Sequence, residues 1–403
     1  MRTKSLIGAV VGCIFLNVSS LFSAIGWIQA TDSADWSKRR NPTVITFDTA
    51  LWVIGGGGSG ATNYNDVWYS KDGATWACAT DSADWINRRS HSSVVFDEKI
   101  WVLGGAAGAT FYNDVWYSPD GAIWACATDS ADWPERSGHT SLVFNDTIWV
   151  IGGSGIGTGV IYRDAWYSLD GVTWTCATDS AEWSARSGHT TLVFNNKMWV
   201  IGGKGAGIGN NFNDVWYSTD GITWTCATDS AEWAARSGHT SVVYDGGMWV
   251  IGGSGASGKV YNDAWYSTNG ITWICATDSA EVLARATHAS DTLNDKIWAI
   301  GGRDSSYTLY NDVWYSGEIA AEEHLPVVRG QLSVNAYPNP FYTCTKICGS
   351  NEELKVYDLG CRVVGITKDG IWNGKDLMGK NAKQGIYFVR NNSKQSLKLI
   401  KLR

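Results

Sequence analysis

The stretch Trp249-Val-Ile-Gly-Gly253, followed by Asn262-Asp-Ala-Trp-Tyr-Ser267, is one of six similar pairs of phrases in this 403-residue chain. The leading tryptophans recur at intervals of 49, 48, 50, 50 and 49 residues, at Trp52, Trp101, Trp149, Trp199, Trp249 and Trp298. From the aspartate of each second phrase to the next tryptophan the count is always 35, whereas from tryptophan to aspartate it varies from 13 to 15. A period near 50 residues is typical of propellers and solenoids. All length variation therefore falls in one segment per repeat.

Each repeat is expected to contain four short strands. In the fifth copy these strands are predicted at residues 239–244, 248–251, 263–267 and 271–275, where β-branched and aromatic residues alternate between turn residues. Asn269-Gly270 separates the last two strands and predicts a two-residue hairpin, because both positions of that turn need a positive φ. Four antiparallel strands in about 50 residues correspond to one propeller blade. The array is therefore predicted to be all-β.

The two ends of the array are incomplete in complementary ways. The sixth copy stops at Gly317 without a fourth strand, and Trp27-Ile-Gln-Ala-Thr31 matches Trp76-Ala-Cys-Ala-Thr80 ahead of the first complete copy. We expect the strand at residues 27–31 to pair with the third strand of the sixth blade, because this closure removes exposed sheet edges. The prediction is a six-bladed β-propeller over residues 27–317, closed by an N-terminal strand.

The repeated phrases resemble those of a known family. The Gly-Gly doublets from Gly55-Gly56 to Gly301-Gly302, the downstream aromatic residue and tryptophan, and an Arg-x-x-His phrase resemble the kelch repeat, whose copies fold as propeller blades. Ser218-Thr-Asp-Gly-Ile-Thr-Trp224 is also similar to the Asp-box of sialidase propellers, shortened by one residue. We interpret this second resemblance as a hairpin that propellers share.

An arginine and a histidine recur just before the first strand of the blades. The arginines stand 13 residues before each tryptophan, and in every copy except the first, which has Pro42, a histidine follows three residues later. Because a site needs a few convergent groups and not the same group in every blade, we interpret both as ties between neighbouring blades and not as zinc or anion ligands. Acidic pairs on the blade links, such as Asp278 and Glu281, are interpreted as caps of short helical turns, with calcium binding as the alternative. No metal and no cofactor are expected.

Five cysteines occupy one equivalent position per repeat, at Cys78, Cys126, Cys176, Cys226 and Cys275. Equivalent positions on neighbouring sheets lie ~10 Å apart, which is too far for a disulfide. We expect buried thiols that act as small apolar side chains. Cys344, Cys348 and Cys361 in the tail leave room for one disulfide, with the pairing open.

The segment of variable length joins the second and third strands of each blade and is the predicted binding surface. It emerges on the same face as the blade links, and loops on a rigid scaffold are where binding concentrates. Each segment ends in an aromatic residue that either stacks on a sugar or peptide or anchors the loop. The candidate ligand-binding residues are these aromatics and the charged residues of the segments: Tyr64, Tyr112, Tyr162, Phe212, Tyr261, Tyr310, Arg163, Lys204, Lys259, Arg303 and Asp304.

Motifs and charge favour a non-catalytic binding protein. No nucleophile-elbow, zinc-protease or phosphate-loop motif occurs, and no acidic residue of the blades is seen to stand out from the repeat pattern. Residues 25–325 carry 17 Lys/Arg against 34 Asp/Glu, which argues against a nucleic-acid partner. The predicted partner is a protein or a glycan. The competing class is a carbohydrate-active propeller enzyme, mutarotase-like for sialic acid or sialidase-like, whose mark would be a unique charged cluster near the channel mouth.

The N-terminus has the order of a secretory signal. Met1-Arg-Thr-Lys4 precedes an apolar stretch over residues 5–16 and small residues up to Gly26, so residues 1–24 are predicted to be a cleaved signal peptide. A retained membrane anchor and lipoprotein processing at Cys13 are the alternatives. After processing no stable membrane span is expected.

The tail differs from the array in composition. Residues 326–403 carry 13 Lys/Arg against 5 Asp/Glu, and short alternating strands after a linker at 318–330 predict a small β-sandwich over 331–403. Tyr337-Pro-Asn-Pro-Phe341, Gly385-Ile-Tyr-Phe-Val389 and Leu397-Lys-Leu-Ile-Lys-Leu402 resemble the Ig-like C-terminal sorting domain of type IX secretion substrates. The resemblance implies contact with the secretion machinery and a secreted or outer-cell-surface location. An Ig-like module that only packs or binds is the alternative.

Overall fold

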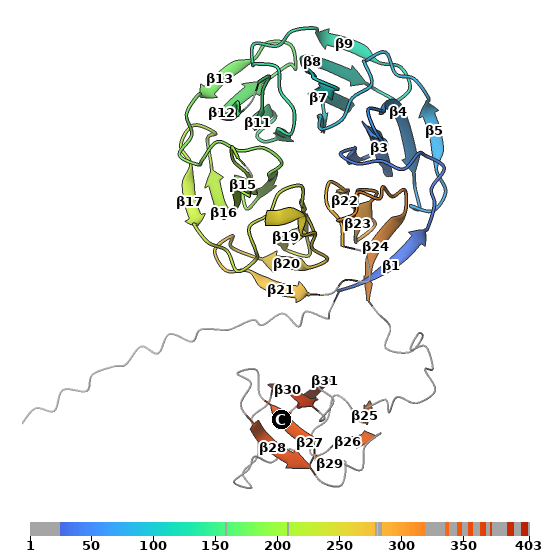
Figure 1. Ribbon diagram of the computed structural model, residues 1–403, viewed down its shortest axis with the longest axis vertical. Helices are drawn as coiled ribbons and strands as arrows, with labels where there is room; N and C mark the ends of the chain where they lie inside the picture. Colours follow the sequence, from blue (N-terminus) through green and yellow to red (C-terminus); the bar gives the residue numbers. More distant parts are fainter. Residues whose placement is uncertain are drawn as a thin grey trace, which may run out of the picture. The chain divides into compact units, whose positions relative to one another are not determined.

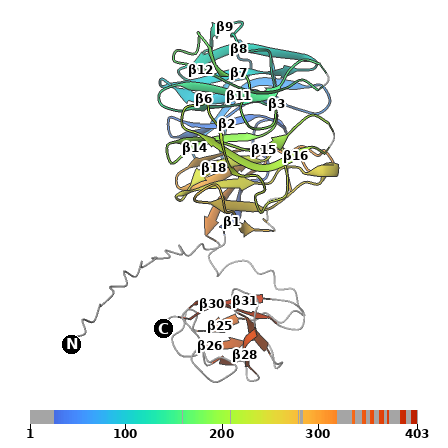
Figure 2. The ribbon, with the colours of Figure 1, turned by 90° about the vertical axis from the view of Figure 1, so that its left-hand side faces the viewer.

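The computed structural model describes residues 25–157, 159–207, 209–278, 280 and 284–318, and seven strands between residues 335 and 401. The chain divides into two units, residues 1–320 and 321–403. Within the first unit, six four-stranded antiparallel sheets follow one another around a ring (Figure 1). Figure 2 turns this ring by 90° and shows it edge-on. The predicted all-β six-bladed propeller is confirmed.

In each blade the first strand is innermost and the fourth is outermost (Figure 1). Blade 1 holds β2 (Thr43–Phe47), β3 (Ala50–Gly57), β4 (Asn63–Ser70) and β5 (Ala77–Thr80); blade 2 holds β6 (Ser92–Phe96), β7 (Lys99–Ala107), β8 (Thr110–Ser118) and β9 (Ala125–Thr128); blade 3 holds β10 (Thr140–Val143), β11 (Ile148–Ser154), β12 (Ile161–Ser168) and β13 (Thr175–Thr178). Blade 4 holds β14 (Thr190–Phe194), β15 (Lys197–Lys204), β16 (Asn211–Ser218) and β17 (Thr225–Thr228); blade 5 holds β18 (Thr240–Tyr244), β19 (Gly247–Ile251), β20 (Ala264–Ser267) and β21 (Ile274–Thr277), with a short 3-10 helix η1 (Ala256–Gly258); blade 6 holds β22 (Ala289–Leu293), β23 (Lys296–Ile300), β24 (Val313–Glu318) and β1 (Ile25–Thr31).

The N-terminal strand β1 completes the sixth blade, as predicted. It pairs antiparallel with β24, and Trp27 lies opposite Ser316. Trp27 is buried in the cluster that contains Trp249 and Ile297. The ring therefore closes by non-covalent pairing of the two ends of the array.

The antiparallel order gives the propeller two different faces. One face, which we call the loop face, carries the variable segments between the second and third strands and the links between blades. The other, the hairpin face, carries the turns between the first and second strands and the loops between the third and fourth. The predicted placement of the variable segments and links on one face is confirmed.

The connection between the third and fourth strands differs from the predicted two-residue hairpin. In blade 5, β20 ends at Ser267 and β21 begins at Ile274, and only Gly270 of the Asn-Gly pair has a positive φ, of 73°. The Asn269 side-chain oxygen accepts hydrogen bonds from the backbone N–H groups of Ile271 and Thr272, at 2.9 and 3.0 Å. The loop is thus held by a side chain. Glycine is needed at 270 because a Cβ there would overlap the Trp199 ring of blade 4.

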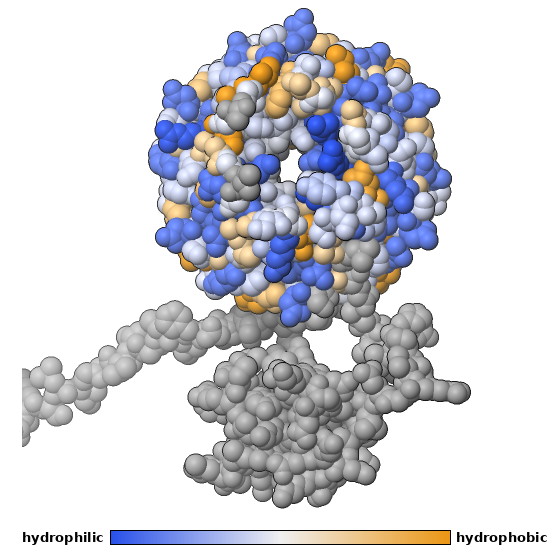
Figure 3. All heavy atoms as spheres, viewed as in Figure 1, coloured by the Kyte–Doolittle hydropathy of each residue, from blue (hydrophilic) through white to orange (hydrophobic). Residues whose placement is uncertain are grey.

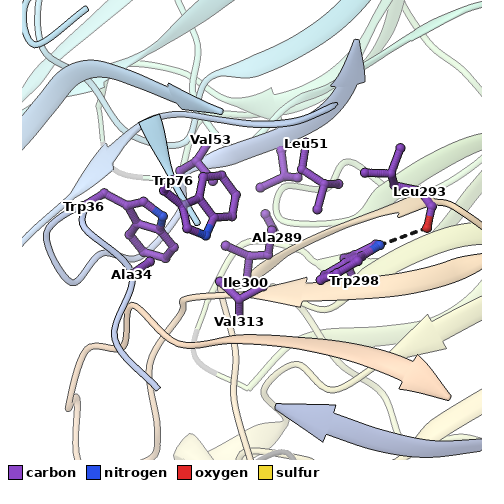
Figure 4. Close-up of a cluster of buried hydrophobic side chains, with 11 residues drawn as sticks. Ala34, Trp36, Leu51, Val53, Trp76, Ala289, Leu293, Trp298, Ile300 and Val313 are labelled. Carbon is purple, nitrogen blue, oxygen red and sulfur yellow. Dashed lines mark hydrogen bonds between the residues drawn. The ribbon is translucent and has the colours of Figure 1, made fainter. Parts of the chain in front are cut away.

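The hydrophobic core lies between successive blades. One cluster joins blades 6 and 1 and includes Trp36, Trp76 and Trp298 (Figure 4). Trp36 and Trp76 meet edge to face with ring centroids 5.9 Å apart, and Trp298 Nε1 donates to the Leu293 carbonyl at 3.0 Å. Five further clusters follow around the ring. Aromatic packing between blades therefore accounts for the recurrence of tryptophan.

Two expectations for the outer part of the blades are wrong. The five repeated cysteines are exposed and free, because they lie on the outermost strands, whose outer side no further blade covers. The blade links contain bends and no helical turn among the described residues. Threonine hydroxyls cap these bends, as Thr228 Oγ1 does for the Ser230 N–H at 3.3 Å. Some acidic side chains instead reach the backbone of a neighbouring loop, as Glu232 does at Trp273, at 2.9 Å.

The second unit contains two antiparallel sheets. One has the order β25 (Asn335–Tyr337), β26 (Thr345–Cys348) and β29 (Ile371–Trp372); the other has the order β28 (Val363–Thr367), β27 (Leu354–Tyr357), β30 (Gly385–Arg390) and β31 (Ser396–Lys401). The sandwich packing and the sorting role stay predictions. The signal at 1–24, most of the linker at 318–330, Cys344 and Cys361 lie outside the described residues. Across the described part of the chain, no helix is long and apolar enough to cross a membrane.

Candidate functional site

In each blade, the buried arginine that precedes the first strand forms an ion pair with the aspartate of the second repeated phrase and donates to a carbonyl of the Gly-Gly phrase. In blade 5, Arg236 donates to both carboxylate oxygens of Asp263, at 2.6 and 2.8 Å, and to the Gly252 carbonyl at 2.7 Å. Trp265 Nε1 donates to the same carboxylate at 2.8 Å. Burial raises the pKa of Asp263, but the hydrogen bonds and charge of Arg236 outweigh it and hold the pKa below its usual value. Equivalent pairs are Arg39–Asp66, Arg88–Asp114, Arg136–Asp164, Arg186–Asp214 and Arg285–Asp312.

The bonds of the repeated arginines correct one expectation, and those of the repeated histidines confirm another. The arginine side chains hold strands of their own blade together, so the predicted side-chain tie between blades is wrong for them. The histidines do tie neighbouring blades: His91 Nε2 shares a hydrogen bond with Thr43 Oγ1 of blade 1 at 3.1 Å. Burial and the charge of Arg88 lower the pKa of His91 to about 3, so its ring is neutral at physiological pH. Among the described residues, no group of three or more His, Cys, Asp or Glu is arranged to hold a metal ion.

The seam between blades 6 and 1 uses a different tie. Blade 1 has Pro42 in place of the histidine, and blade 6 has Ala289 in place of the serine or threonine that would receive it. Instead, Asp291 accepts a hydrogen bond from the Thr46 N–H at 2.6 Å, and the Thr46 hydroxyl donates to the Thr292 carbonyl at 2.8 Å. Burial raises the pKa of Asp291. The other blades carry an aliphatic residue at this position, so the expectation that no acidic residue departs from the repeat is wrong.

The six predicted aromatic residues are half-buried and stack on the buried arginines of their own blades. The guanidinium carbons lie 4.4 to 5.2 Å from the ring centroids, for Tyr64, Tyr112, Tyr162, Phe212, Tyr261 and Tyr310. The Tyr310 hydroxyl also donates to Asp304 at 3.0 Å. One ring face of each is therefore used to anchor its loop, and a role of the other face in binding stays a prediction.

The five predicted charged residues lie on four different blades. Arg163, Lys204 and Lys259 are exposed on blades 3, 4 and 5. Arg303 and Asp304 adjoin each other on blade 6, where the Arg303 guanidinium lies 4.2 Å from the Tyr307 ring centroid. The structure thus brings only the last two of these five together in one blade.

A closed ring of backbone hydrogen bonds surrounds the central opening on the loop face, and Figure 3 shows this opening through the propeller. One residue per blade donates its N–H to the carbonyl of the equivalent residue in the preceding blade, at 2.7 to 3.2 Å. All six residues have φ between 49° and 62°. They are Asn41, Ser90, Gly138, Gly188, Gly238 and Thr287.

This mouth ring is asymmetric. Blades 3, 4 and 5 contribute glycine, whereas blades 6, 1 and 2 contribute Thr287, Asn41 and Ser90. The residue before each ring position is Ser or Ala in blades 3 to 6 but arginine in blades 1 and 2, at Arg40 and Arg89. Both arginines are absent from the predicted site because that prediction was confined to the variable segments. Aligning the six copies position by position would have found them.

Backbone hydrogen bonds and side-chain contacts place Arg303, Arg40 and Arg89 consecutively around the mouth ring. The Gly302 N–H donates to the Arg39 carbonyl at 2.9 Å, which brings Arg303 beside Arg40. Arg40 pairs through its backbone with Gly57, and the Arg89 side chain packs over Gly57. Arg89 Nη1 donates to Asn63 Oδ1 at 2.9 Å. Burial and the neighbouring charge of Arg40 lower the pKa of Arg89.

Among the pockets lined by described residues, three open on the hairpin face, between blades. The pocket between blades 1 and 2 has a volume of about 980 Å³ and is lined by residues that include Trp52, Tyr69 and Cys78. Those between blades 2 and 3 and between blades 5 and 6 have volumes of about 870 and 510 Å³. None of the predicted ligand-binding residues lines these three pockets.

Comparisons with known proteins agree with the fold. A family model described as the KLHDC2/KLHL20/DRC7 kelch-repeats domain matches residues 138–316. Among solved structures, the chain is similar to one titled "Structure of YjhT", with a TM-score of 0.60 and 16% sequence identity, over 70% of this chain and 96% of that chain. The chain has no significant match among curated proteins. At this identity the structural likeness shows the fold alone.

Proposed function

Because residues 25–318 form a six-bladed kelch-repeat propeller, we propose that the protein is a non-catalytic binding protein that engages a protein or glycan through the loop face. The observation that carries this proposal is the breakdown of the sixfold pattern on that face. There the copies differ in segment length, in charge and in the residues of the mouth ring. The repeated Arg, Asp and His side chains are instead engaged in bonds within and between blades.

The competing proposal is a carbohydrate-active propeller enzyme, and Arg40 with Arg89 supplies the unique charged cluster expected for it. Such an enzyme also needs an acid or base beside the cluster. Asp291 lies four residues beyond Thr287 along the chain, ~13 Å at the usual strand rise, and it is bonded to Thr46. Asp304 is bonded by Tyr310 and by the backbone of its own loop. These placements favour binding over turnover.

We further propose that the protein acts outside the cell. This part rests on the order of residues 1–26 and on the sorting-domain resemblance of the tail. An exported propeller with an acidic composition and a distinct loop face is suited to an extracellular ligand.

The test is a glycan array and a pull-down with the full chain and two variants. One variant replaces Arg163, Lys204, Lys259, Arg303 and Asp304 with alanine. The matched control replaces Leu169 and Ile222, which are exposed on the hairpin face, with serine. We expect ligand retention by the control and loss in the loop-face variant. Unchanged binding by the loop-face variant would contradict the proposal, and turnover of a sialoside would support the enzyme instead.

A further inference from the structure

We propose that the channel mouth over blades 6, 1 and 2 binds a carboxylate group of an acidic glycan, held by Arg303, Arg40 and Arg89. This inference rests on the proposed function, because it names the ligand class for the loop face. The mouth is the place where three adjacent blades depart from the repeat at once.

The three arginines have no acidic partner among the described residues. The ion pairs found there are the six Arg–Asp pairs within the blades and the pair Lys99–Asp97. Yet the array as a whole is acidic, with 17 Lys/Arg against 34 Asp/Glu over residues 25–325. Adjacent like charges without a counter-ion are unfavourable, and a guanidinium binds a carboxylate through two parallel hydrogen bonds. An anionic ligand would supply the missing countercharge.

Open hydrogen-bonding positions lie beside these charges. Arg40 Nε and the Thr287 hydroxyl are buried and have no hydrogen-bond partner. Most buried polar groups in folded proteins are bonded, so each unbonded group calls for an explanation. Both belong to the half of the mouth that carries the arginines. A polar ligand seated there would engage both groups.

Among the six positions of the mouth ring, the non-glycine residues with positive φ lie in the same half. Thr287 and Ser90 hold φ values of 57° and 54°, at ring positions where blades 3 to 5 have glycine. A β-branched residue in this conformation is a genuine outlier, and such outliers cluster at functional sites. Tyr307, next to Arg303, also has a positive φ, of 64°, and its side chain is 64% exposed. The strained residues therefore place two hydroxyl groups at the mouth, that of Thr287 buried, beside an exposed aromatic ring.

This set of groups favours an acidic glycan over other anions. A sugar ring has apolar faces and edges that carry hydroxyls. The exposed Tyr307 ring is suited to its face, and the polar side chains of the mouth ring, from Thr287, Asn41 and Ser90, are suited to its edge. A nucleic acid needs an extended basic surface, and here the basic groups form a compact cluster on an acidic propeller. The arginines would bind the carboxylate while Tyr307 stacks on the sugar.

The test is calorimetric titration of the full chain with sialyllactose and with an oligogalacturonate, using lactose as the neutral probe and a hexaglutamate peptide as the second anionic probe. The variant R40S/R89S restores the serine that blades 3 to 5 carry. The matched control K71T removes an exposed cation of the hairpin face and restores the threonine that blades 4 and 5 carry. Both variants follow the chain's own repeat, so both are expected to fold.

We expect one of the two acidic glycans to bind more tightly than lactose, with an affinity about 10- to 100-fold weaker for each arginine removed. K71T should leave the affinity unchanged, and raising the salt concentration should weaken binding. Equal affinity for lactose, or no change in R40S/R89S, would overturn the inference. Arginine-dependent binding of hexaglutamate alone would overturn the glycan assignment. If acidic glycans fail to bind but the five-alanine variant still loses another ligand, the proposed function stands and this inference fails.

Discussion

Removing one carboxylate of the buried ion pairs should destabilise the propeller strongly. In Asp263→Ala, the Arg236 guanidinium keeps its bond to the Gly252 carbonyl but loses two charge-assisted bonds, and the Trp265 indole loses its acceptor. Because the arginine side chain is fully buried, its charge stays uncompensated. Breaking such a pair costs about 3–5 kcal/mol. For a propeller of about 290 residues, with an unfolding entropy of about 2.1 cal/mol/K per residue, the loss corresponds to a fall in Tm of about 5–8 °C.

The assay is thermal unfolding of the full chain followed by tryptophan fluorescence. The matched control is Asp278→Ala, which removes a carboxylate from the blade link after the same blade. The double variant R236M/D263L should recover much of the loss, because apolar replacement of both partners removes the uncompensated charge. A fall in Tm of less than 2 °C for Asp263→Ala, or a double variant no better than the single one, would refute the reasoning.

The same pair predicts a pH dependence. The pKa of Asp263 in the folded protein is lower than that of a free carboxyl. Its contribution to the free energy of unfolding is therefore complete above about pH 5 and is lost as the pH falls through the folded-state pKa. Asp263→Ala should flatten the acid side of the stability profile.

Further predictions concern other parts of the fold. Gly270→Ala should lower stability by about 2 kcal/mol more than Gly246→Ala, since both have positive φ but only Gly270 abuts Trp199; equal losses in urea unfolding would contradict the packing argument. The buried histidines, such as His288 with a pKa lowered to about 3, take up protons on unfolding, so stability should fall by about 1.4 kcal/mol per histidine per pH unit below pH 6.5, and a His288→Gln variant that titrates like the wild type would argue against this. Deleting residues 25–31 should open the ring and promote aggregation through the exposed edge of β24; a monomer of unchanged Tm by light scattering and calorimetry would show that closure is dispensable. Deleting residues 326–403 should abolish surface display in the producing cell, and normal display would contradict the sorting role.

Much of the fold could be predicted from spacing alone. The constant count of 35 covers strands and loops that pack against the next blade, and the match between residues 27–31 and 76–80 identified the strand that closes the ring. The wrong expectations concern positions whose surroundings depend on three dimensions. Cys275 is apolar and regularly repeated, but its exposure follows from the absence of any blade outside β21.

The candidate site was predicted only in part. The loop face was named correctly as the face of the variable segments, and Arg303 and Asp304 lie there together. Arg40 and Arg89 were overlooked because they belong to the constant part of the repeat, where Asp291 was overlooked too. The six aromatics turned out to be stacked on buried arginines, a contact between residues more than 20 positions apart along the chain.

The sequence by itself determined the number of blades, the strand order within them and the strand that closes the ring. These follow from local periodicity and from the need to pair every sheet edge, both of which can be read along one dimension. Only the tertiary structure decided which repeated groups bond within a blade, which bond between blades, and that six residues with positive φ join in one hydrogen-bonded ring. The reason is physical: these contacts join residues from different repeats, and their geometry exists only once the ring has closed.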